Sequence, residues 1–479
     1  MSSKPDILVF LSDQHHAQYA GFAGHSLVRT PHLDQLAKEG TVMSTAYTSS
    51  PLCVPSRTSM LTGQLPEKTG VFTNGGAIGS DQATFLHGIA AEGYDTVLCG
   101  RMHFLGEDQR HGFTRRIMGE LTPLFWGRYG QARTDLGPYV GTMANKSLKI
   151  IGGGTSPVLE YDKAVIKAAL EYLQEDHAKP QCIVVGTYGP HHTFVAPPDR
   201  YMYYKERMDI PESFLQDDGH PVLQKLRQNH QLTIENVTKL RAAYLGMIET
   251  IDSQVGEVRS AWNRYLERSA RPGLFVYMSD HGEQAGEHGL IGKSTFYEGS
   301  SKIPMVLAGE GVVAGRNISQ PVSIMDLGPT LCAFAGAETP PRQDGMNLKL
   351  LLNGGAEDAE RIVISECMET LEGKHIPGRM LRKGNWKFVA YVYYEQHNQL
   401  FDLSSDPKEL HNLVHERADI AEQFQAQLDA SWNIPAIIEK HQQKLEHHQL
   451  LAKWGKAVDV SEQERWPVPE EATKLPIVE

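Results

Sequence analysis

The hydrophobic positions of the chain follow two alternating patterns over most of its length. Short, nearly continuous apolar runs that end in polar residues are typical of buried strands; they include DILVFLSD at 6–13, QCIVVGTY at 181–188 and GLFVYMSD at 273–280. Longer amphipathic stretches, at 162–176 and 236–266, predict helices. Strands that alternate with helices favour an α/β fold, in which a large, mostly parallel sheet is sandwiched by helices.

Capping and turn residues mark where individual elements begin and end. Thr30 and Pro31 are residue types favoured at the start of a helix and Gly40 is favoured after its end, so residues 31–39 are predicted to be helical. Residues 93–103, GYDTVLCGRMH, predict a strand that runs into a loop. A further strand and a further helix are predicted at 303–309 and 325–336.

The pattern changes near residue 361, where short runs typical of antiparallel strands follow one another. These runs lie at 361–368, 379–394 and 399–403, and a helix is predicted after them at 420–431. From residue 434 the chain is polar and helical and then rich in proline, which suggests an arm over the body or over a neighbouring subunit. A chain of 479 residues is too long for one simple core. We therefore predict three parts: a main domain at 1–360, a small α+β domain at 361–433 and a tail at 434–479.

The charge and composition argue against several classes of protein. With 46 basic against 58 acidic residues, the net charge of -12 argues against a nucleic-acid partner. No apolar run approaches the length of about 20 residues that crosses a bilayer. The first apolar stretch is interrupted at Ser12 and Asp13, so we interpret it as a strand and not as a signal peptide. The five cysteines are odd in number and widely spread, which fits the reducing cytoplasm and no disulfide framework.

Two acidic residues stand where two predicted strands end. Asp13 closes the first strand and is followed by Gln14, while Asp280 closes a later strand and is followed by His281. Ligands in open α/β sheets bind beyond the carboxyl ends of the strands, and such side chains could hold a hard divalent cation, Ca²⁺ or Mg²⁺. Taken alone, each Asp is better explained as a cap of a loop or helix. Because both stand in the same place, at the end of a predicted strand, the pair favours a metal site.

The stretch CVPSRTSMLTG, from Cys53 to Gly63, carries the most specific pattern in the chain. A free thiol alone explains neither the proline nor the serine nor the arginine that follow it. Position for position, the stretch resembles the C-x-P-S-R-x-x-x-L-T-G signature of the type I sulfatases. The resemblance extends to GYDTVLCGRMHF, SDHGEQAGEHGLIGK, DLGPT and QLFDLSSDPKELHNL. Within the family the chain most resembles the choline sulfatases, through MHFLGEDQRHGF, FYEGSSKIPM and the tail that begins SWNIPAI.

The resemblance implies an alkaline-phosphatase-like fold and a modified nucleophile. In this family the cysteine, here Cys53, is oxidised by a maturation enzyme to Cα-formylglycine. The hydrated aldehyde carries two hydroxyls on one carbon: one attacks sulfur, and deprotonation of the other then releases sulfate by C–O cleavage. The resemblance also implies one divalent cation, Ca²⁺ in preference to Mg²⁺. Its implied ligands are Asp13, Gln14, the modified Cys53, Asp280 and His281.

Further roles follow from the resemblance, residue by residue. Arg57 would hold the formylglycine hydrate, for which its planar donor fork is suited. Arg101 and His103 fall where sulfatases usually have Lys-x-His; His103 would be the base that collapses the sulfated intermediate, whereas an arginine at 101 keeps the charge but cannot release a proton. His191 would touch the sulfate or the leaving oxygen, and Lys293 would bind sulfate and protonate the leaving group.

By the same resemblance, Asn74 and Trp126 fall near the positions that line the substrate end of the site in choline sulfatases. His192 is expected either to contact the substrate or to lie behind the residues that do. An aromatic face such as that of Trp126 suits a quaternary ammonium group, although the sequence does not reveal the carboxylate that would accompany it. The histidine-rich run at 441–451 is interpreted as a solvated helix face, and Cys99 and Cys182 are interpreted as core residues.

Three functions remain open at this point. The first is a sulfatase that hydrolyses the sulfate ester of a small organic alcohol or sugar, such as choline sulfate or a sulfated carbohydrate. The second is a phosphonate monoester or phosphodiester hydrolase on the same scaffold, because sulfate and phosphate monoanions have similar shapes. The third is a non-catalytic binding protein that kept the fold. The polar tail suggests a homo-oligomer.

Overall fold

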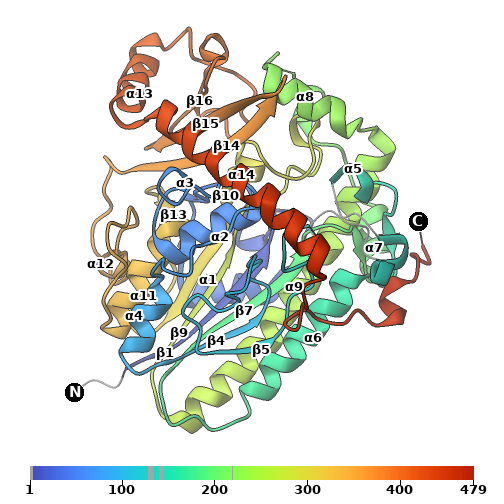
Figure 1. Ribbon diagram of the computed structural model, residues 1–479, viewed down its shortest axis with the longest axis vertical. Helices are drawn as coiled ribbons and strands as arrows, with labels where there is room; N and C mark the ends of the chain where they lie inside the picture. The colour runs from blue at the N-terminus through green and yellow to red at the C-terminus, as the bar shows by residue number, and fades with distance from the viewer. Residues whose placement is uncertain (1–3, 128–133, 140–143, 218, 479) are drawn as a thin grey trace.

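The main sheet of the protein lies at the centre of the molecule (Figure 1). The computed structural model describes residues 4–127, 134–139, 144–217 and 219–478. Within them, eight strands form this sheet in the order β12-β2-β11-β9-β1-β7-β4-β5, and β11 runs antiparallel to both of its neighbours. The predicted α/β fold with a large, mostly parallel sheet is confirmed. The strands are β1 (Asp6–Asp13), β2 (Thr41–Met43), β4 (Asp95–Gly100), β5 (Arg115–Met118), β7 (Gln181–Pro190), β9 (Gly273–Ser279), β11 (Met305–Gly309) and β12 (Arg316–Ile318).

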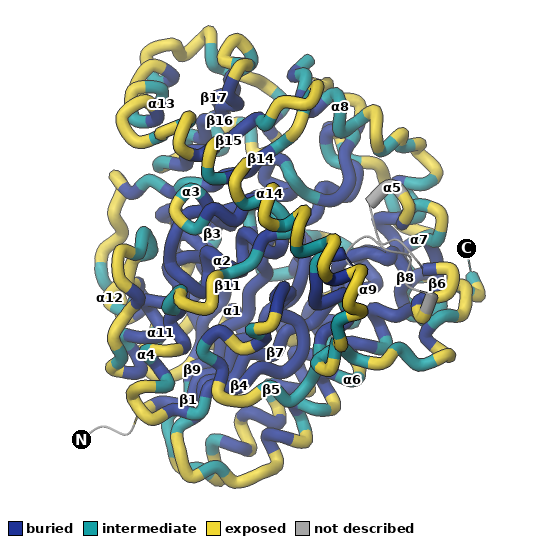
Figure 2. Tube along the Cα trace, in the orientation of Figure 1, coloured by how far each residue is buried: buried dark blue, intermediate teal, exposed yellow. Residues whose placement is uncertain are grey.

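Helices cover both faces of this sheet, and the alternation of side chains along β1 separates the two layers. Leu8 and Phe10 face the layer of α1, α6 and α9, whereas Ile7, Val9 and Leu11 face the layer of α2, α4 and α11. Every residue of β1 is buried, which explains why the run is apolar without interruption (Figure 2). The helices are α1 (Pro31–Glu39), α2 (Cys53–Thr62), α4 (Phe85–Ala91), α6 (Pro157–Tyr172), α9 (Ile234–Ser269) and α11 (Leu327–Ala335).

The start of α1 differs in detail from the sequence prediction. Thr30 occupies the N-cap position, but its hydroxyl accepts a hydrogen bond from the backbone N–H of Gly21 at 2.7 Å and does not cap the helix. The backbone N–H groups of His32 and Leu33 instead donate to the Asp252 carboxylate, at 3.3 and 2.8 Å. The cap of α1 therefore comes from α9, which lies far away in the sequence.

The antiparallel elements predicted after residue 361 are present and pack against the main body. The sheet has the order β14 (Ile362–Leu371), β15 (Lys374–Lys383), β16 (Trp386–Tyr391) and β17 (Gln399–Asp402), and α13 (Ala418–Ser431) follows it. Lys387 is buried and lies 3.0 Å from Glu298 and 2.7 Å from Glu409. The three-part division of the chain stays a prediction.

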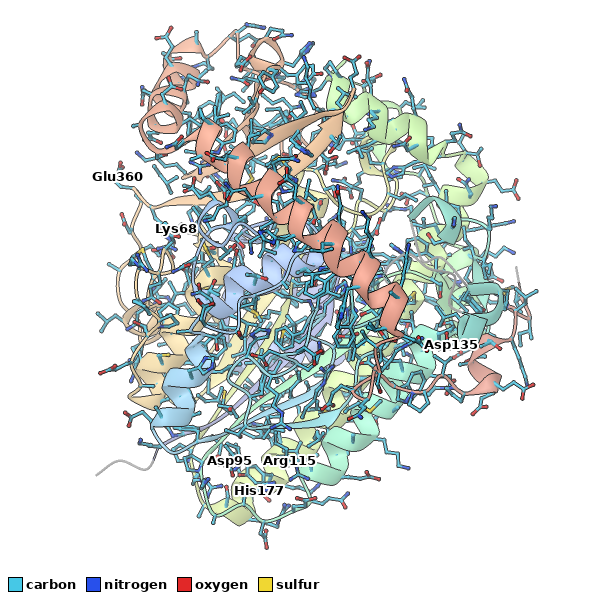
Figure 3. The ribbon with its side chains drawn as sticks, viewed as in Figure 1. Lys68, Asp95, Arg115, Asp135, His177 and Glu360 are labelled. Carbon is cyan, nitrogen blue, oxygen red and sulfur yellow. The ribbon has the colours of Figure 1, made fainter. Side chains whose placement is uncertain are left out.

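The helix α14 (Ile434–Val458) crosses over the body of the same chain (Figure 1). His441 is buried at its inner side, where it packs edge-on against Phe72, and His448 stacks on Trp126 with a centroid separation of 5.5 Å. The interpretation of this run as a solvated face is therefore wrong for His441, because α14 packs this side chain against Phe72 of the body. Figure 3 labels Lys68, whose backbone carbonyl accepts a hydrogen bond from Lys440 of this helix.

The remaining strands and helices are short. The strands are β3 (Ala46–Tyr47), β6 (Gly152–Gly153), β8 (Val195–Ala196), β10 (Lys302–Ile303) and β13 (Val322–Ser323), and the helices are α3 (Pro66–Thr69), α5 (Ala144–Ser147), α7 (Pro198–Lys205), α8 (Pro221–His230), α10 (Glu298–Ser301) and α12 (Lys349–Leu352). Among the described residues, no helix combines the length and the apolar character that a membrane span requires.

Replacing Asp252 by Ala is expected to lower the free energy of unfolding by about 1 kcal/mol, the usual contribution of a helix cap. Urea denaturation followed by circular dichroism measures this change. Glu257→Ala, at an exposed position of the same helix, is the control and should leave the urea midpoint unchanged. An unchanged midpoint for Asp252→Ala would contradict the capping role.

Candidate active site

Two carboxylates meet at the carboxyl edge of the main sheet. The strands β1 and β9 are parallel neighbours in which Ser12 pairs with Ser279, so Asp13 and Asp280 stand side by side. Both are fully buried. The backbone N–H of Gln14, which adopts a φ of 70°, donates to Asp280 Oδ1 at 3.1 Å. The strand register thus creates the pair of acids from which the rest of the site is built.

The N-terminus of α2 points at this pair. Cys53, the first residue of α2, lies with its Sγ 3.1 Å from His281 Nε2 and 3.7 Å from Asp13 Oδ1. Asp13, Cys53, Asp280 and His281 each offer one possible ligand atom, and these atoms lie within 4.8 Å of one another. The N-terminal N–H groups of a helix favour an anion, so this place suits a sulfate or phosphate group as well as a cation.

His281 is in the form that a metal ligand requires. Its Nδ1 lies 3.0 Å from the carbonyl of Gly282 and must donate there, which leaves the lone pair of Nε2 facing Cys53. Burial lowers the pKa of His281 to about 4, so the ring is neutral at neutral pH. A ring N–H held by a backbone carbonyl is the usual support of a metal-bound histidine. The neutral ring of His281 and the carboxylates of Asp13 and Asp280 therefore fit a divalent cation.

Three cationic side chains balance the buried acids. Arg57 donates to Asp280 Oδ2 at 2.7 Å and to Asp13 Oδ2 at 3.1 Å, and Arg101 donates to Asp13 Oδ2 at 2.6 Å. Lys293 Nζ lies 2.9 Å from Cys53 Sγ. Burial alone would raise the pKa of Asp13, but Arg101 and the neighbouring cationic groups hold it well below its usual value. The acid is therefore ionised despite its burial.

The two histidines predicted to be catalytic, His103 and His191, are both buried. Arg101 lies 2.9 Å from His103 Nδ1 and must be the donor, because a guanidinium has no acceptor. The proton of the neutral His103 ring is therefore on Nε2. Burial and the charge of Arg101 lower the pKa of His103. His191 follows β7 and donates from Nδ1 to the carbonyl of His192 at 2.7 Å. Burial, together with His192 and Lys293, holds the pKa of His191 well below its usual value.

Comparison with known proteins agrees with this geometry. The family model for sulfatases matches residues 5–337, and the model for the C-terminal region of N-sulphoglucosamine sulphohydrolase matches residues 286–433. The chain belongs to the sulfatase family. The prediction of a sulfuric ester hydrolase is thereby confirmed.

The sulfatase is similar to proteins of several activities. The choline-sulfatase of Rhizobium meliloti (strain 1021) is 32% identical over 434 residues, which cover 86% of this chain and 83% of that protein. The fold is similar to the phosphonate monoester hydrolase of Agrobacterium radiobacter, with a TM-score of 0.73, 21% identity and coverage of 89% and 95% of the two chains. It is also similar to a structure in complex with its substrate D-glucosamine-2-N,6-O-disulfate, with a TM-score of 0.71, 20% identity and coverage of 96% and 99%. The two structural likenesses establish the fold alone.

Two residues predicted at the substrate end of the sulfatase, Asn74 and Trp126, make contacts that the structure defines. Asn74 Oδ1 accepts a hydrogen bond from the backbone N–H of Val54 at 3.0 Å, and thereby caps α2, whose own N-cap Leu52 offers no side-chain acceptor. Trp126 donates from its ring N–H to the carbonyl of Gly75 at 2.8 Å and stacks on His448 of α14. The third, His192, lies with Nδ1 3.5 Å from the side-chain nitrogen of Gln14.

Two buried glutamates of the sulfatase site were missing from the sequence prediction. Glu120 lies 3.1 Å from Arg101 Nη1 and accepts the backbone N–H of His103 at 2.9 Å. Its own backbone pairs with the tail, since Glu120 N–H donates to Glu464 and Trp466 N–H donates to Glu120, both at 2.8 Å. The second is Glu283, which contacts Gln14. No sequence pattern marks Glu120, whereas Glu283 stands inside the quoted stretch SDHGEQAGEHG.

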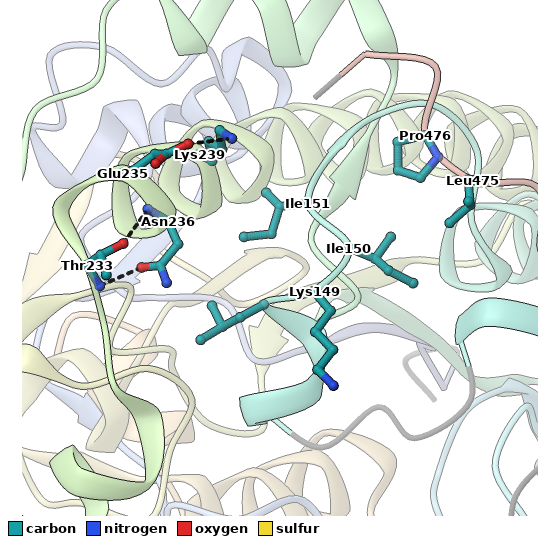
Figure 4. A pocket seen from close by; sticks show the side chains of 10 residues that line it. Lys149, Ile150, Ile151, Thr233, Glu235, Asn236, Lys239, Leu475 and Pro476 are labelled. Atoms are coloured by element: carbon teal, nitrogen blue, oxygen red, sulfur yellow. Dashed lines mark hydrogen bonds and ion pairs between the residues drawn. The ribbon is translucent and has the colours of Figure 1, made fainter.

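A separate pocket lies away from this site (Figure 4). It has a volume of about 310 Å³ and lies between residues 148–151, the start of α9 and the tail. Glu235 and Lys239, which line it, form an ion pair at 2.9 Å. None of the predicted catalytic residues is among the described residues that line it.

Replacing Glu120 by Gln is expected to destabilise the protein by about 3 kcal/mol, because the variant leaves Arg101 partly uncompensated in a buried site. Chemical denaturation measures the loss. Glu175→Gln is the control, since Glu175 is exposed and its distance to Arg115 is 3.9 Å; it should change stability by less than about 1 kcal/mol. Equal effects of the two substitutions would contradict the structural role of Glu120.

The same pair of variants tests an acid dependence. Arg101 and neighbouring groups overcome the effect of burial and lower the pKa of Glu120 from 4.5 to about 2. A lowered carboxyl pKa contributes stability that is present above pH 4.5 and is lost as the pH falls through about 2. The Glu120→Gln variant should therefore lose less stability than the control between these two values, as measured by denaturation at a series of pH values.

Proposed function

We propose that this sulfatase uses a formylglycine formed from Cys53 as its nucleophile, together with one divalent cation. The observation that carries the proposal is the position of Cys53: it begins a buried helix, lies 2.9 Å from Lys293 Nζ and belongs to a group of four possible ligand residues. A maturation enzyme that oxidises Cys53 is the partner this proposal requires.

The proposed metal ligands are Asp13, Gln14, Asp280, His281 and the modified residue at 53. When bound, the cation would neutralise sulfate oxygens and lower the pKa of the attacking hydroxyl. Carboxylate and amide oxygens suit Ca²⁺ and Mg²⁺ alike, but Ca²⁺ accepts more protein ligands, whereas Mg²⁺ keeps several waters. Five ligand residues therefore support Ca²⁺ as the first choice.

In the proposed reaction, one hydroxyl of the hydrate loses its proton as its oxygen bonds to sulfur, and the S–O bond to the alcohol breaks. The proton lost by the hydrate replaces the one that the leaving alcohol takes up. Lys293 binds the sulfate and donates the proton to the leaving alcohol, and His191 contacts the sulfate or the leaving oxygen. Arg57 orients the hydrate and balances the charge of Asp13 and Asp280. The second hydroxyl then loses its proton, the C=O bond forms, the C–O bond to sulfate breaks, and water hydrates the aldehyde again.

His103 is the proposed base for the second deprotonation. Because Arg101 donates to Nδ1, the proton of the neutral His103 ring is on Nε2. Arg101 must release Nδ1 before the ring can accept the proton of the second hydroxyl. The lowered pKa of His103 keeps the ring neutral before the step. Loss of this base should slow release of sulfate more than attack on sulfur.

We further propose a small organic sulfate ester, such as choline sulfate, as the substrate, with a sulfated sugar as the other candidate of this class. The 32% identity to a choline-sulfatase supports the first candidate. The indole of Trp126, one face of which stacks on His448, is the aromatic group proposed to contact a quaternary ammonium. The cytoplasm is the proposed location, supported by five free and buried cysteines. The polar tail supports the proposal of a homo-oligomer.

The mass of the peptide that contains Cys53 tests the nucleophile. In protein purified from its own host, the peptide should be lighter by the difference between a –CH₂SH and a –CHO side chain. Cys53→Ala should abolish turnover of sulfate esters and leave the melting temperature near that of the unmodified protein. An unmodified cysteine in active enzyme, or an active Cys53→Ala variant, would refute the proposed nucleophile.

A comparison of two ester classes tests the substrate. The fold likeness to a phosphonate monoester hydrolase makes phosphonate monoesters the second candidate. The value of kcat/KM for an aryl sulfate and for choline sulfate should exceed that for a phenylphosphonate ester of the same leaving group. A clear preference for the phosphonate would leave the nucleophile intact but assign the enzyme to the second class of substrate.

A further inference from the structure

Glu283 is a fully buried carboxylate that lies outside the predicted ligand set but contacts one member of it. Its Oε2 accepts a hydrogen bond from the side-chain nitrogen of Gln14. Its Oε1 accepts the backbone N–H of Ala285 at 2.9 Å and the backbone N–H of Gly292. Each contact donates to Glu283, so the side chain is held as an acceptor with both oxygens occupied.

The contacts of Gln14 leave its amide only one orientation. The side-chain nitrogen donates to the Glu283 carboxylate, which only accepts, and lies 3.5 Å from His192 Nδ1. The side-chain oxygen lies 2.6 Å from Lys293 Nζ, which only donates. A rotation of the amide by half a turn would therefore break favourable contacts at both ends. It would also place an NH₂ group where the proposed cation needs an oxygen.

We infer that Glu283 is a positioning residue that fixes the Gln14 oxygen toward the cation site and, through the amide of Gly292, holds the backbone beside Lys293. This inference rests on the metal site proposed above. The same carboxylate thus links a metal ligand that follows β1 to the lysine that contacts Cys53, although the two lie far apart in the sequence.

Glu283→Gln tests the inference without removing volume. The single oxygen of the new amide must still accept from the backbone N–H groups of Ala285 and Gly292, so its NH₂ group meets the NH₂ group of Gln14. The clash is relieved when the Gln14 amide turns over, and the cation site then loses an oxygen. Groups that orient metal ligands typically contribute about 10–100-fold to metal affinity. We expect a loss in that range, measured by calorimetric titration of chelator-treated protein with CaCl₂ and with MgCl₂.

A double-mutant cycle separates this role from a general loss of structure. Gln14→Ala should weaken cation binding, and adding Glu283→Gln to it should cause no further loss, because Glu283 acts through Gln14. Fully additive losses in correctly folded variants would overturn the inference. Asp252→Asn is the matched control, because Asp252 is also buried and accepts two backbone N–H groups; it should leave cation affinity unchanged.

The exchange of the two residues gives a second test if Glu283→Gln folds poorly. The double variant Gln14→Glu with Glu283→Gln keeps the total charge, restores a donor opposite an acceptor, and turns a carboxylate oxygen toward the cation. It should regain most of the affinity lost in Glu283→Gln; a folded double variant without that recovery would overturn the inference. If the unaltered protein binds neither cation, the proposed metal site itself fails. If it binds and Glu283→Gln binds equally well, only the role of Glu283 fails.

Discussion

The whole site depends on the balance of charge around two carboxylates that are removed from water. Asp13 and Asp280 are fully buried side by side, an arrangement whose repulsion and lost hydration would be costly without partners. Arg57 bridges both acids, and Arg101 contacts the first. This balance fixes the elements around it, since α2 must bring Arg57 and Cys53 together, and the loop after β4 must bring Arg101. The cation and the sulfate of the proposed reaction would bind among charged groups that the fold has already arranged.

Much of the fold and of the site was predictable because the relevant signals are local. The buried strands appear as apolar runs, and the acids stand at their ends, so the pairing of Asp13 with Asp280 follows from parallel topology. The start of α6 was predicted at residue 162 but lies at Pro157, although Ser156 and Pro157 are recognisable start signals. The role of Cys53 was predicted from the resemblance of CVPSRTSMLTG to the sulfatase signature, which the periodicity of apolar residues does not reveal.

The parts that were not predicted depend on contacts between distant segments. Glu120 is an ordinary residue in the sequence, and it gains its role only because the tail pairs with its backbone and Arg101 reaches its side chain. Asp252 caps a helix that begins more than two hundred residues earlier. His441 carries no sign of burial in the sequence, since its burial results from the path of α14 over the body. Tertiary contacts of this kind leave no local pattern.

The ladder between β1 and β9 has a consequence for how the enzyme can change. Because neighbouring residues of a strand point to opposite faces, an insertion or deletion of one residue inside either strand would turn its terminal acid away from the other. The segments beyond the strands face no such restriction, because loops tolerate changes of length. Loops around Cys53 can therefore change in length during evolution, whereas β1 and β9 must keep their lengths for Asp13 and Asp280 to stay side by side.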